Sequence, residues 1–81
     1  MFTTGRYASK KSRDLARRLA KEKKESYISR GKHTIAQLTE MARKKGEENL
    51  HIIEERKKEP VKLALIKITE TKWQWVNENE L

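Results

Sequence analysis

Residues 27–46, YISRGKHTIAQLTEMARKKG, decide how the chain folds, because they contain a strand pattern, a turn and a complete helix signal. Residues 27–29 are short and β-prone at their start, which suits a brief strand. The helix signal begins at Thr34, where the Thr hydroxyl and the Gln37 side chain can each satisfy a free backbone N–H. Apolar residues then recur at helical spacing until Gly46, which suits the left-handed residue after a helix. The stretch predicts a short strand followed by a helix.

The residues before this stretch repeat the order of strand and then helix. Residues 2–6 alternate as a short strand does, and Ser9 can cap a following helix. Residues 10–24, KKSRDLARRLAKEKK, contain strong helix formers and no Gly or Pro. The apolar face of this helix carries Leu15, Ala16, Leu19 and Ala20.

The residues after the stretch are mostly β-prone. Residues 50–53 form an apolar run that suits a buried strand, and residues 57–60 suit a turn. Residues 61–76 suit a long final strand, so the last two strands are expected to form an antiparallel hairpin. Residues 77–81 are expected to be a short frayed tail, which leaves a single domain over residues 1–76.

These elements predict an α/β protein with the order β-α-β-α-β-β. Strands that alternate with helices usually form a parallel sheet with right-handed crossovers. We therefore expect a small mixed sheet, mostly parallel, with two helices. A chain of 81 residues, of which 35% are hydrophobic, has only a thin core, so one small domain is the natural size.

The positive charge is concentrated in the first part of the chain. Residues 1–33 hold eleven Lys or Arg and three Asp or Glu, whereas residues 34–81 hold nine of each, so the whole excess of +8 lies early. A one-sided basic surface favours a polyanion partner such as nucleic acid over a merely solvated face. The sequence has no apolar run long enough to span a membrane. It also has no cysteine for a disulfide or a thiolate metal site.

The sequence shows no pattern of catalytic or metal-binding residues. His33 and His51 are the only histidines, and neither belongs to a spaced set of ligands. His51 lies within a strand pattern, where a packed position on the sheet is more common than catalysis. A nucleotide-binding P-loop fails because Ser26 and His33 stand at two of its fixed positions. We therefore expect no enzyme activity, no metal and no cofactor.

Two features suit contact with phosphates: the basic helix over residues 10–24 and the turn Arg30-Gly31-Lys32 before the second helix. A helix N-terminus attracts anions, Gly31 lets a phosphate approach the backbone, and Arg30 and Lys32 add charge. The local sequence leaves open whether Gly31 only permits a tight turn. Both features follow predicted strands, so they are expected at one edge of the sheet. The candidate RNA-binding residues are Arg6, Lys10, Lys11, Arg13, Arg17, Arg18, Lys21, Arg30, Gly31 and Lys32.

Trp73 and Trp75 support an alternative function in protein interaction. They alternate on one face of the last expected strand, and Trp side chains are favoured anchors at interfaces. An edge strand is also a template for docking. The partner would be another protein or a second copy of the chain across the exposed sheet edge. The sequence leaves open whether both Trp side chains instead close the small core.

Four segments of the sequence carry a resemblance to a known family: residues 3–6 (TTGR), 9–13 (SKKSR), 30–32 (RGK) and 57–60 (KKEP). In this order they resemble the first half of a Brix (Imp4-like) domain of archaeal type, over nearly all of residues 2–68. Family domains usually contain two such α/β halves. The turn before the last strand differs from the usual family pattern, because Lys58-Glu59 replaces a Gly-Asn pair.

The resemblance implies a role in ribosome assembly. The resemblance also implies binding to rRNA. The two halves of a family domain resemble the anticodon-binding α/β domains of tRNA synthetases. From the resemblance we expect rRNA and ribosomal or pre-ribosomal proteins as partners, a ribosome-associated cytoplasmic location and no membrane. Whether the chain acts transiently in assembly or stays in a mature subunit is left open.

Overall fold

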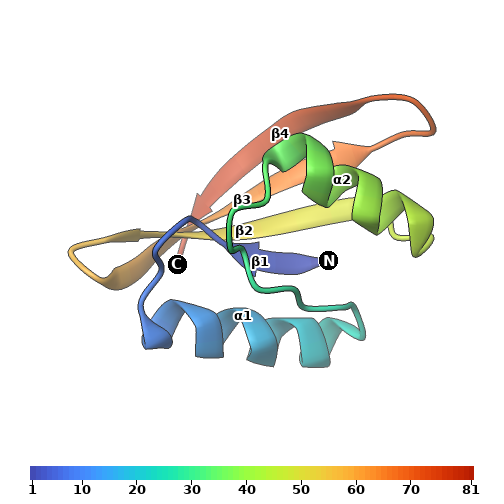
Figure 1. Ribbon diagram of the computed structural model, residues 1–81. Coiled ribbons are helices and arrows are strands. Elements are labelled where there is room, and N and C mark those ends of the chain that lie inside the picture. The colour runs from blue at the N-terminus through green and yellow to red at the C-terminus, as the bar shows by residue number, and fades with distance from the viewer.

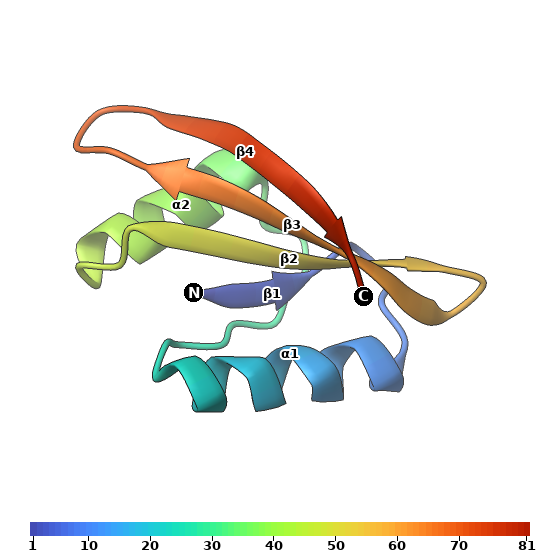
Figure 2. The ribbon, with the colours of Figure 1, turned by 180° about the vertical axis from the view of Figure 1, so that it is seen from behind.

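The computed structural model describes all residues 1–81, which form one mixed sheet and two helices. The sheet has the strand order β1-β2-β3-β4, as Figures 1 and 2 show from opposite sides. The elements are β1 (Phe2–Thr4), α1 (Lys10–Lys23), α2 (Ile35–Lys44), β2 (Asn49–Arg56), β3 (Glu59–Ile68) and β4 (Trp73–Glu80).

The predicted α/β class with two helices and a mixed sheet is confirmed, and so is the antiparallel hairpin between β2 and β3. The expectation of a mostly parallel sheet is wrong, because only β1 and β2 pair in parallel, whereas β2 with β3 and β3 with β4 pair antiparallel. The physical reason is the chain order: three consecutive strands are joined by short turns, which connect antiparallel neighbours. The hairpin turn at Lys57 and Lys58 places both residues at positive φ, 51° and 64°, as a two-residue primed turn requires.

Residues 27–29 do not form a strand of the sheet. Tyr27 makes a single parallel bridge to Phe2, supported by bonds from Phe2 N to Ser26 O at 2.8 Å and from Ile28 N to Phe2 O at 3.0 Å. The chain then leaves the edge of β1 for the turn at residues 30–32, so pairing cannot continue. The observed order is therefore β-α-α-β-β-β, in place of the expected β-α-β-α-β-β.

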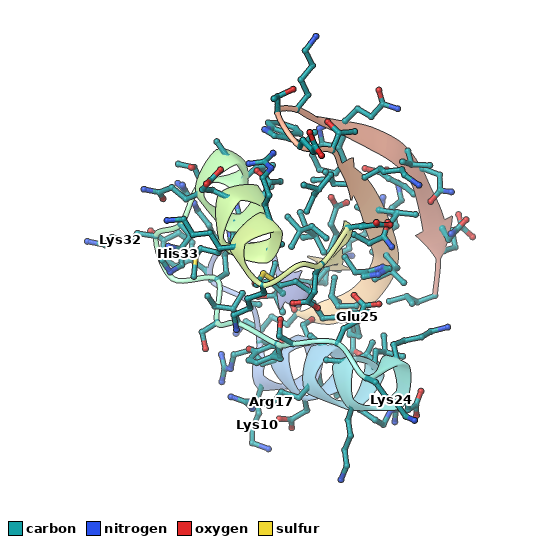
Figure 3. All side chains as sticks on the ribbon, turned by 90° about the vertical axis from the view of Figure 1, so that its right-hand side faces the viewer. Lys10, Arg17, Lys24, Glu25, Lys32 and His33 are labelled. Atoms are coloured by element: carbon teal, nitrogen blue, oxygen red, sulfur yellow. The ribbon has the colours of Figure 1, made fainter.

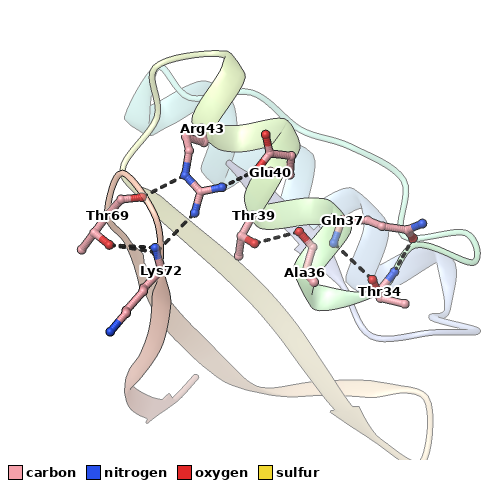
Figure 4. Close-up of polar contacts among 8 residues, drawn as sticks. All are labelled: Thr34, Ala36, Gln37, Thr39, Glu40, Arg43, Thr69 and Lys72. Carbon is pink, nitrogen blue, oxygen red and sulfur yellow. Dashed lines mark hydrogen bonds and ion pairs between the residues drawn. The ribbon is translucent and has the colours of Figure 1, made fainter.

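The expected long strand over residues 61–76 is two strands separated by a tight turn. The N–H of Thr69 donates to the carbonyl of Lys72 at 2.8 Å and so closes the turn. Arg43 of α2 holds it from outside, since Nε donates to Thr69 O at 2.9 Å and Nη2 to Lys72 O at 3.3 Å (Figure 4). Neither Gly nor Pro marks this turn, which is why the pattern read as continuous.

The second half of β4 occupies the segment expected to be a tail. Residues 77–80 pair with residues 62–65 of β3, and a register irregularity lies between Leu65 and Ile66. Residues 77–80 therefore extend the sheet as part of β4, where the sequence predicts a tail. Leu81 follows the strand, and its N–H donates to Val61 O at 2.9 Å.

The predicted helix caps are present. The Ser9 side chain accepts from the backbone N–H of Ser12 at the start of α1. Thr34 and Gln37 form the reciprocal capping box at the start of α2 (Figure 4). Gly46 follows α2 with φ +76°, the left-handed angle expected there.

The two helices cover opposite faces of the sheet. On β2, Leu50 and Ile52 belong to the hydrophobic cluster of α2, whereas Ile53 belongs to the cluster of α1. Successive residues of a strand point to opposite faces, so the alternation assigns one helix to each face. Phe2 packs with the α1 cluster and Met1 with the α2 cluster, so β1 lies between the two layers.

Candidate nucleic-acid interface

A hollow of about 470 Å³ lies where the loop after β1 meets the Arg30-Gly31-Lys32 turn. The bridge at Tyr27 runs parallel to β1, so the segments that follow each of them leave the sheet at the same edge. The structure thus brings Arg6 and the Arg30-Gly31-Lys32 turn together. We call this feature the basic hollow; it is lined by Thr4, Gly5, Arg6, Tyr7, Ala8, Arg13, Ser29, Arg30, Gly31 and Lys32.

The lining of the basic hollow contains four cationic side chains and no carboxylate. Arg6 and Lys32 are exposed, and their side chains make no hydrogen bond or ion pair within the chain. Arg13 is anchored, because Nη1 donates to Ala8 O at 2.7 Å. Arg30 is anchored twice, with Nη1 donating to Thr4 O at 3.1 Å and Nε to His33 O at 2.9 Å. The hollow therefore combines two anchored guanidinium groups with two cations whose side chains have no partner within the chain.

The electrostatic state of Arg30 reflects this crowding of positive charge. Burial, followed by the nearby charge of Arg6, lowers the pKa of Arg30 from its ordinary value. Arginine nevertheless stays charged in proteins. Like charges held together without a counter-charge repel one another, and a bound anion would relieve that repulsion.

The remaining predicted cations of α1 lie outside the basic hollow. Lys10 and Arg17 pair with Asp14 at 2.9 and 3.3 Å, and Lys11 pairs with Glu59 of β3 at 2.7 Å. Figure 3 shows Lys10 pointing away from the sheet. Such exposed pairs contribute little, so these cations can exchange partners readily. Arg18 and Lys21 are exposed and make no ion pair.

The N-termini of the two helices offer less to an anion than the sequence indicates. At α2, the capping box already engages the N–H groups of Thr34 and Gln37. At α1, the carboxylate of Glu55 accepts from Ser9 N at 3.1 Å, from Ser9 Oγ at 2.7 Å and from the Ser12 hydroxyl. These bonds, that of Ser12 first, lower the pKa of Glu55. The side chains and turn of the hollow, rather than a helix end, therefore form the candidate anion site.

Gly31 has φ +50°, which favours glycine, and a Cβ built there would meet no atom within 4 Å. Within the chain, its need for glycine is thus conformational rather than steric. The space in front of it is open toward solvent beside Lys32, which extends outward in Figure 3.

Tyr7 is a residue of the basic hollow that the sequence analysis does not single out. Its side chain is 98% exposed, and its φ is 58°. The one signal in the sequence is its position directly after Arg6, between the first strand and the cap of the first helix.

Trp73 and Trp75 lie on β4, the edge strand of the sheet, opposite Ile68 and Ile66. They are 37% and 49% exposed, so they do not close the core. Val76, the next residue, is exposed as well. This end of β4 is therefore an apolar strip beside unpaired backbone.

His51 occupies a packed position on the sheet, as expected. Its ring stacks on Phe2 with centroids 4.1 Å apart and an interplanar angle of 11°. Burial lowers the pKa of His51, against the opposing charge of Glu25, whose Oε2 lies 3.5 Å from Nε2. The structure contains no group of three or more His, Asp or Glu side chains placed to hold a metal ion. Neither helix is long and apolar enough to cross a membrane.

No protein-family model matches the chain, and no curated protein matches it. Among solved structures, the archaeal Imp4-like protein Mil superposes with a TM-score of 0.73 and 26% identity, over 82% of this chain and 42% of that one. A probable ribosomal biogenesis protein from Aeropyrum pernix K1 superposes with a TM-score of 0.75 and 20% identity, over 83% of this chain and 38% of that one. The chain thus spans about two fifths of the length of each structure that it matches.

At 20% identity, the second structure supports the fold alone. The chain therefore has the fold of part of an Imp4-like protein, consistent with a fragment of a Brix-like domain.

Proposed function

We propose that this chain is a non-catalytic RNA-binding domain that works in ribosome assembly and holds rRNA by its phosphates. The observation that carries the proposal is the basic hollow, where Arg6, Arg13, Arg30 and Lys32 converge without any carboxylate. The likeness to the archaeal Imp4-like protein Mil supports the same process, because the resemblance to that family implies a role in ribosome assembly.

In this proposal the two kinds of cation act differently. Arg13 and Arg30 are held in place by backbone carbonyls, so they present their remaining N–H donors at little entropic cost. Arg6 and Lys32 are free to adjust to the position of a phosphate. The exposed cations of α1 extend the contact along the helix, through Lys10, Lys11, Arg17, Arg18 and Lys21. Contacts of this kind position the protein on RNA and do not read its sequence.

The proposal predicts that Arg6→Ala with Lys32→Ala weakens RNA binding and flattens its dependence on salt. Each lost phosphate contact should reduce the slope of log affinity against log salt by about 0.7 to 0.9, so the pair should reduce it by about 1.5. The measurement is the affinity for an rRNA fragment at several salt concentrations.

The matched control is Lys44→Ala with Lys67→Ala, which removes the same charge from exposed positions that make no ion pair and lie outside the basic hollow. The control should keep most of the slope. Equal losses in the two double variants would show that only the net charge matters, and the assignment of the hollow would then fail.

A second candidate function is protein docking through β4. It is favoured by the exposure of Trp73 and Trp75 on an edge strand, because such a strand can pair with a partner while the Trp side chains anchor it. The partner would be a ribosomal or pre-ribosomal protein, or a second copy of the chain. The basic hollow lies beside β1 and docking would use β4, and these are the two edge strands of the sheet. One molecule can therefore bind RNA and a protein partner at the same time.

We further propose that the four strands and two helices form a single domain, and that it works in the cytoplasm on ribosomes or their precursors. The sheet shared by all four strands supports the single domain. The location follows from the proposed process alone.

A further inference from the structure

Tyr7 is an aromatic residue whose side chain does not take part in the packing of the fold. Its side chain is 98% exposed, so burial of the ring does not stabilise the fold. Its φ of 58° is a left-handed angle that disfavours a residue with a Cβ. Gly or Asn would suit that backbone better. Neither packing nor backbone geometry therefore accounts for a tyrosine at this position.

The surroundings of Tyr7 point to an anionic, aromatic ligand. Tyr7 lies in the lining of the basic hollow, directly after the free side chain of Arg6, with Lys32 also in that lining. The backbone N–H groups of residues 6, 7, 31 and 32 make no hydrogen bond within the chain. The volume of about 470 Å³ lies within the range of roughly 300 to 1,000 Å³ that is typical of small-ligand sites. The hollow thus offers cations, free N–H donors and one exposed ring together.

The two exposed Trp residues and the half-buried second tyrosine lack this setting. Trp73 and Trp75 lie on β4 in the same strand as Glu78 and Glu80. The Tyr27 ring is covered by the guanidinium of Arg17, whose Cζ lies 5.0 Å from the ring centroid. Tyr7 is thus the aromatic side chain that lies in the basic hollow, beside the unpaired cations Arg6 and Lys32.

We propose that Tyr7 stacks on an unpaired RNA base while Arg6, Lys32 and the anchored guanidinium groups hold the phosphates beside it. The inference rests on the proposed function and specifies its substrate: a single-stranded or bulged segment of RNA. Proteins that bind single strands combine a positive groove with aromatic rings on which bases stack. In an A-form duplex each base is already stacked, and the major groove is too deep and narrow for side chains to reach. A ring on a surface loop therefore gains contact only from an unpaired base.

The experiment compares wild type, Tyr7→Ala and Tyr7→Trp for binding to two probes. The probes are a short single-stranded RNA of mixed sequence and the same strand annealed to its complement. Loss of one base stack should weaken Tyr7→Ala on the single strand by about 5- to 150-fold. The duplex affinity of Tyr7→Ala should change by less than about twofold, because phosphate contacts dominate there. Tyr7→Trp should retain the single-strand affinity.

A further variant, Tyr7→Gly, separates stacking from damage to the fold. Gly relieves the left-handed strain, so its thermal midpoint should rise while its single-strand affinity falls. A fall in both would mean that Tyr7 supports the fold, and the stacking role would be refuted. Unchanged single-strand affinity in Tyr7→Ala, or an equal loss on both probes, would refute it too.

The same experiment distinguishes this inference from the proposed function. Suppose that wild type binds RNA, that Arg6→Ala with Lys32→Ala weakens this binding, and that Tyr7→Ala leaves it unchanged. Phosphate binding at the basic hollow is then supported, and base stacking by Tyr7 is refuted. If wild type binds neither probe, both fall.

Discussion

Positive φ angles show which residues of this chain adopt strained backbone for the sake of a turn. A residue with a Cβ in the left-handed region costs roughly 1–2 kcal/mol relative to a relaxed one. Two glycines avoid that cost, whereas a tyrosine and three lysines bear it. The residues are Gly31, Gly46, Tyr7, Lys24, Lys57 and Lys58.

Gly31 and Gly5 provide a matched pair for measuring this strain, because both belong to the basic hollow and a Cβ at either would meet no atom within 4 Å. Only Gly31 has a positive φ. We expect Gly31→Ala to reduce the free energy of unfolding by about 1 kcal/mol, and Gly5→Ala to change it little. Urea denaturation measures both values. Equal effects of the two substitutions would mean that the turn conformation of Gly31 is not the cause.

At the scale of elements, a carboxylate from the sheet stabilises the start of a helix. Glu55 of β2 accepts from Ser9 and Ser12 at the N-terminus of α1. A negative charge there complements the helix dipole. The sheet and α1 are thus joined by polar contacts at the same end of the helix as the basic hollow. A second polar contact joins α2 to the turn between β3 and β4, where the Arg43 side chain donates to the carbonyls of Thr69 and Lys72.

The bonds to Glu55 predict a dependence of stability on pH. The pKa of Glu55 lies below its ordinary value of 4.5 in the folded protein, so the unfolded chain binds more protons near that pH. The stability is therefore present above 4.5 and is lost as pH falls through the lowered folded pKa. We expect Glu55→Gln to be less stable than wild type at neutral pH and to lose less on acidification.

The measurement is the urea midpoint as a function of pH. Glu54→Gln is the control, since Glu54 is its neighbour on β2 and its side chain makes no hydrogen bond or ion pair. The control should follow wild type through the acid range. If Glu55→Gln followed it as well, the contacts with Ser9 and Ser12 would not be the source of the pH dependence.

At the scale of the whole molecule, the exposed Trp side chains of β4 give the protein-docking function a direct readout. We expect the Trp emission of the isolated monomer to be red-shifted and readily quenched by acrylamide, because Trp73 and Trp75 are 37% and 49% exposed. Binding of a protein partner at β4 should shift the emission to the blue and protect it. The single variants Trp73→Phe and Trp75→Phe assign the signal. Protected emission in a verified monomer would remove the reason to propose docking.

Sequence reasoning predicted the helices well because their signals are local. The caps at Ser9, Thr34 and Gly46 require only neighbouring backbone groups, and all three are present. Strand pairing was predicted less well, because it depends on which distant segments meet. Residues 27–29 have a strand pattern but only one bridge, and residues 69–72 turn without a local turn residue.

The sequence by itself determined the α/β class, both helices, the β2–β3 hairpin and the concentration of positive charge in residues 1–33, since each follows from spacing or count. Only the tertiary structure decided which cations lie together. Arg6 and Lys32 meet in the basic hollow, whereas Lys11 pairs with Glu59 on another strand. The tertiary structure also decided that the Tyr7 side chain is exposed and that residues 77–80 pair with β3. The physical reason is that exposure and long-range pairing depend on contacts between residues far apart in the chain, which local propensity does not encode.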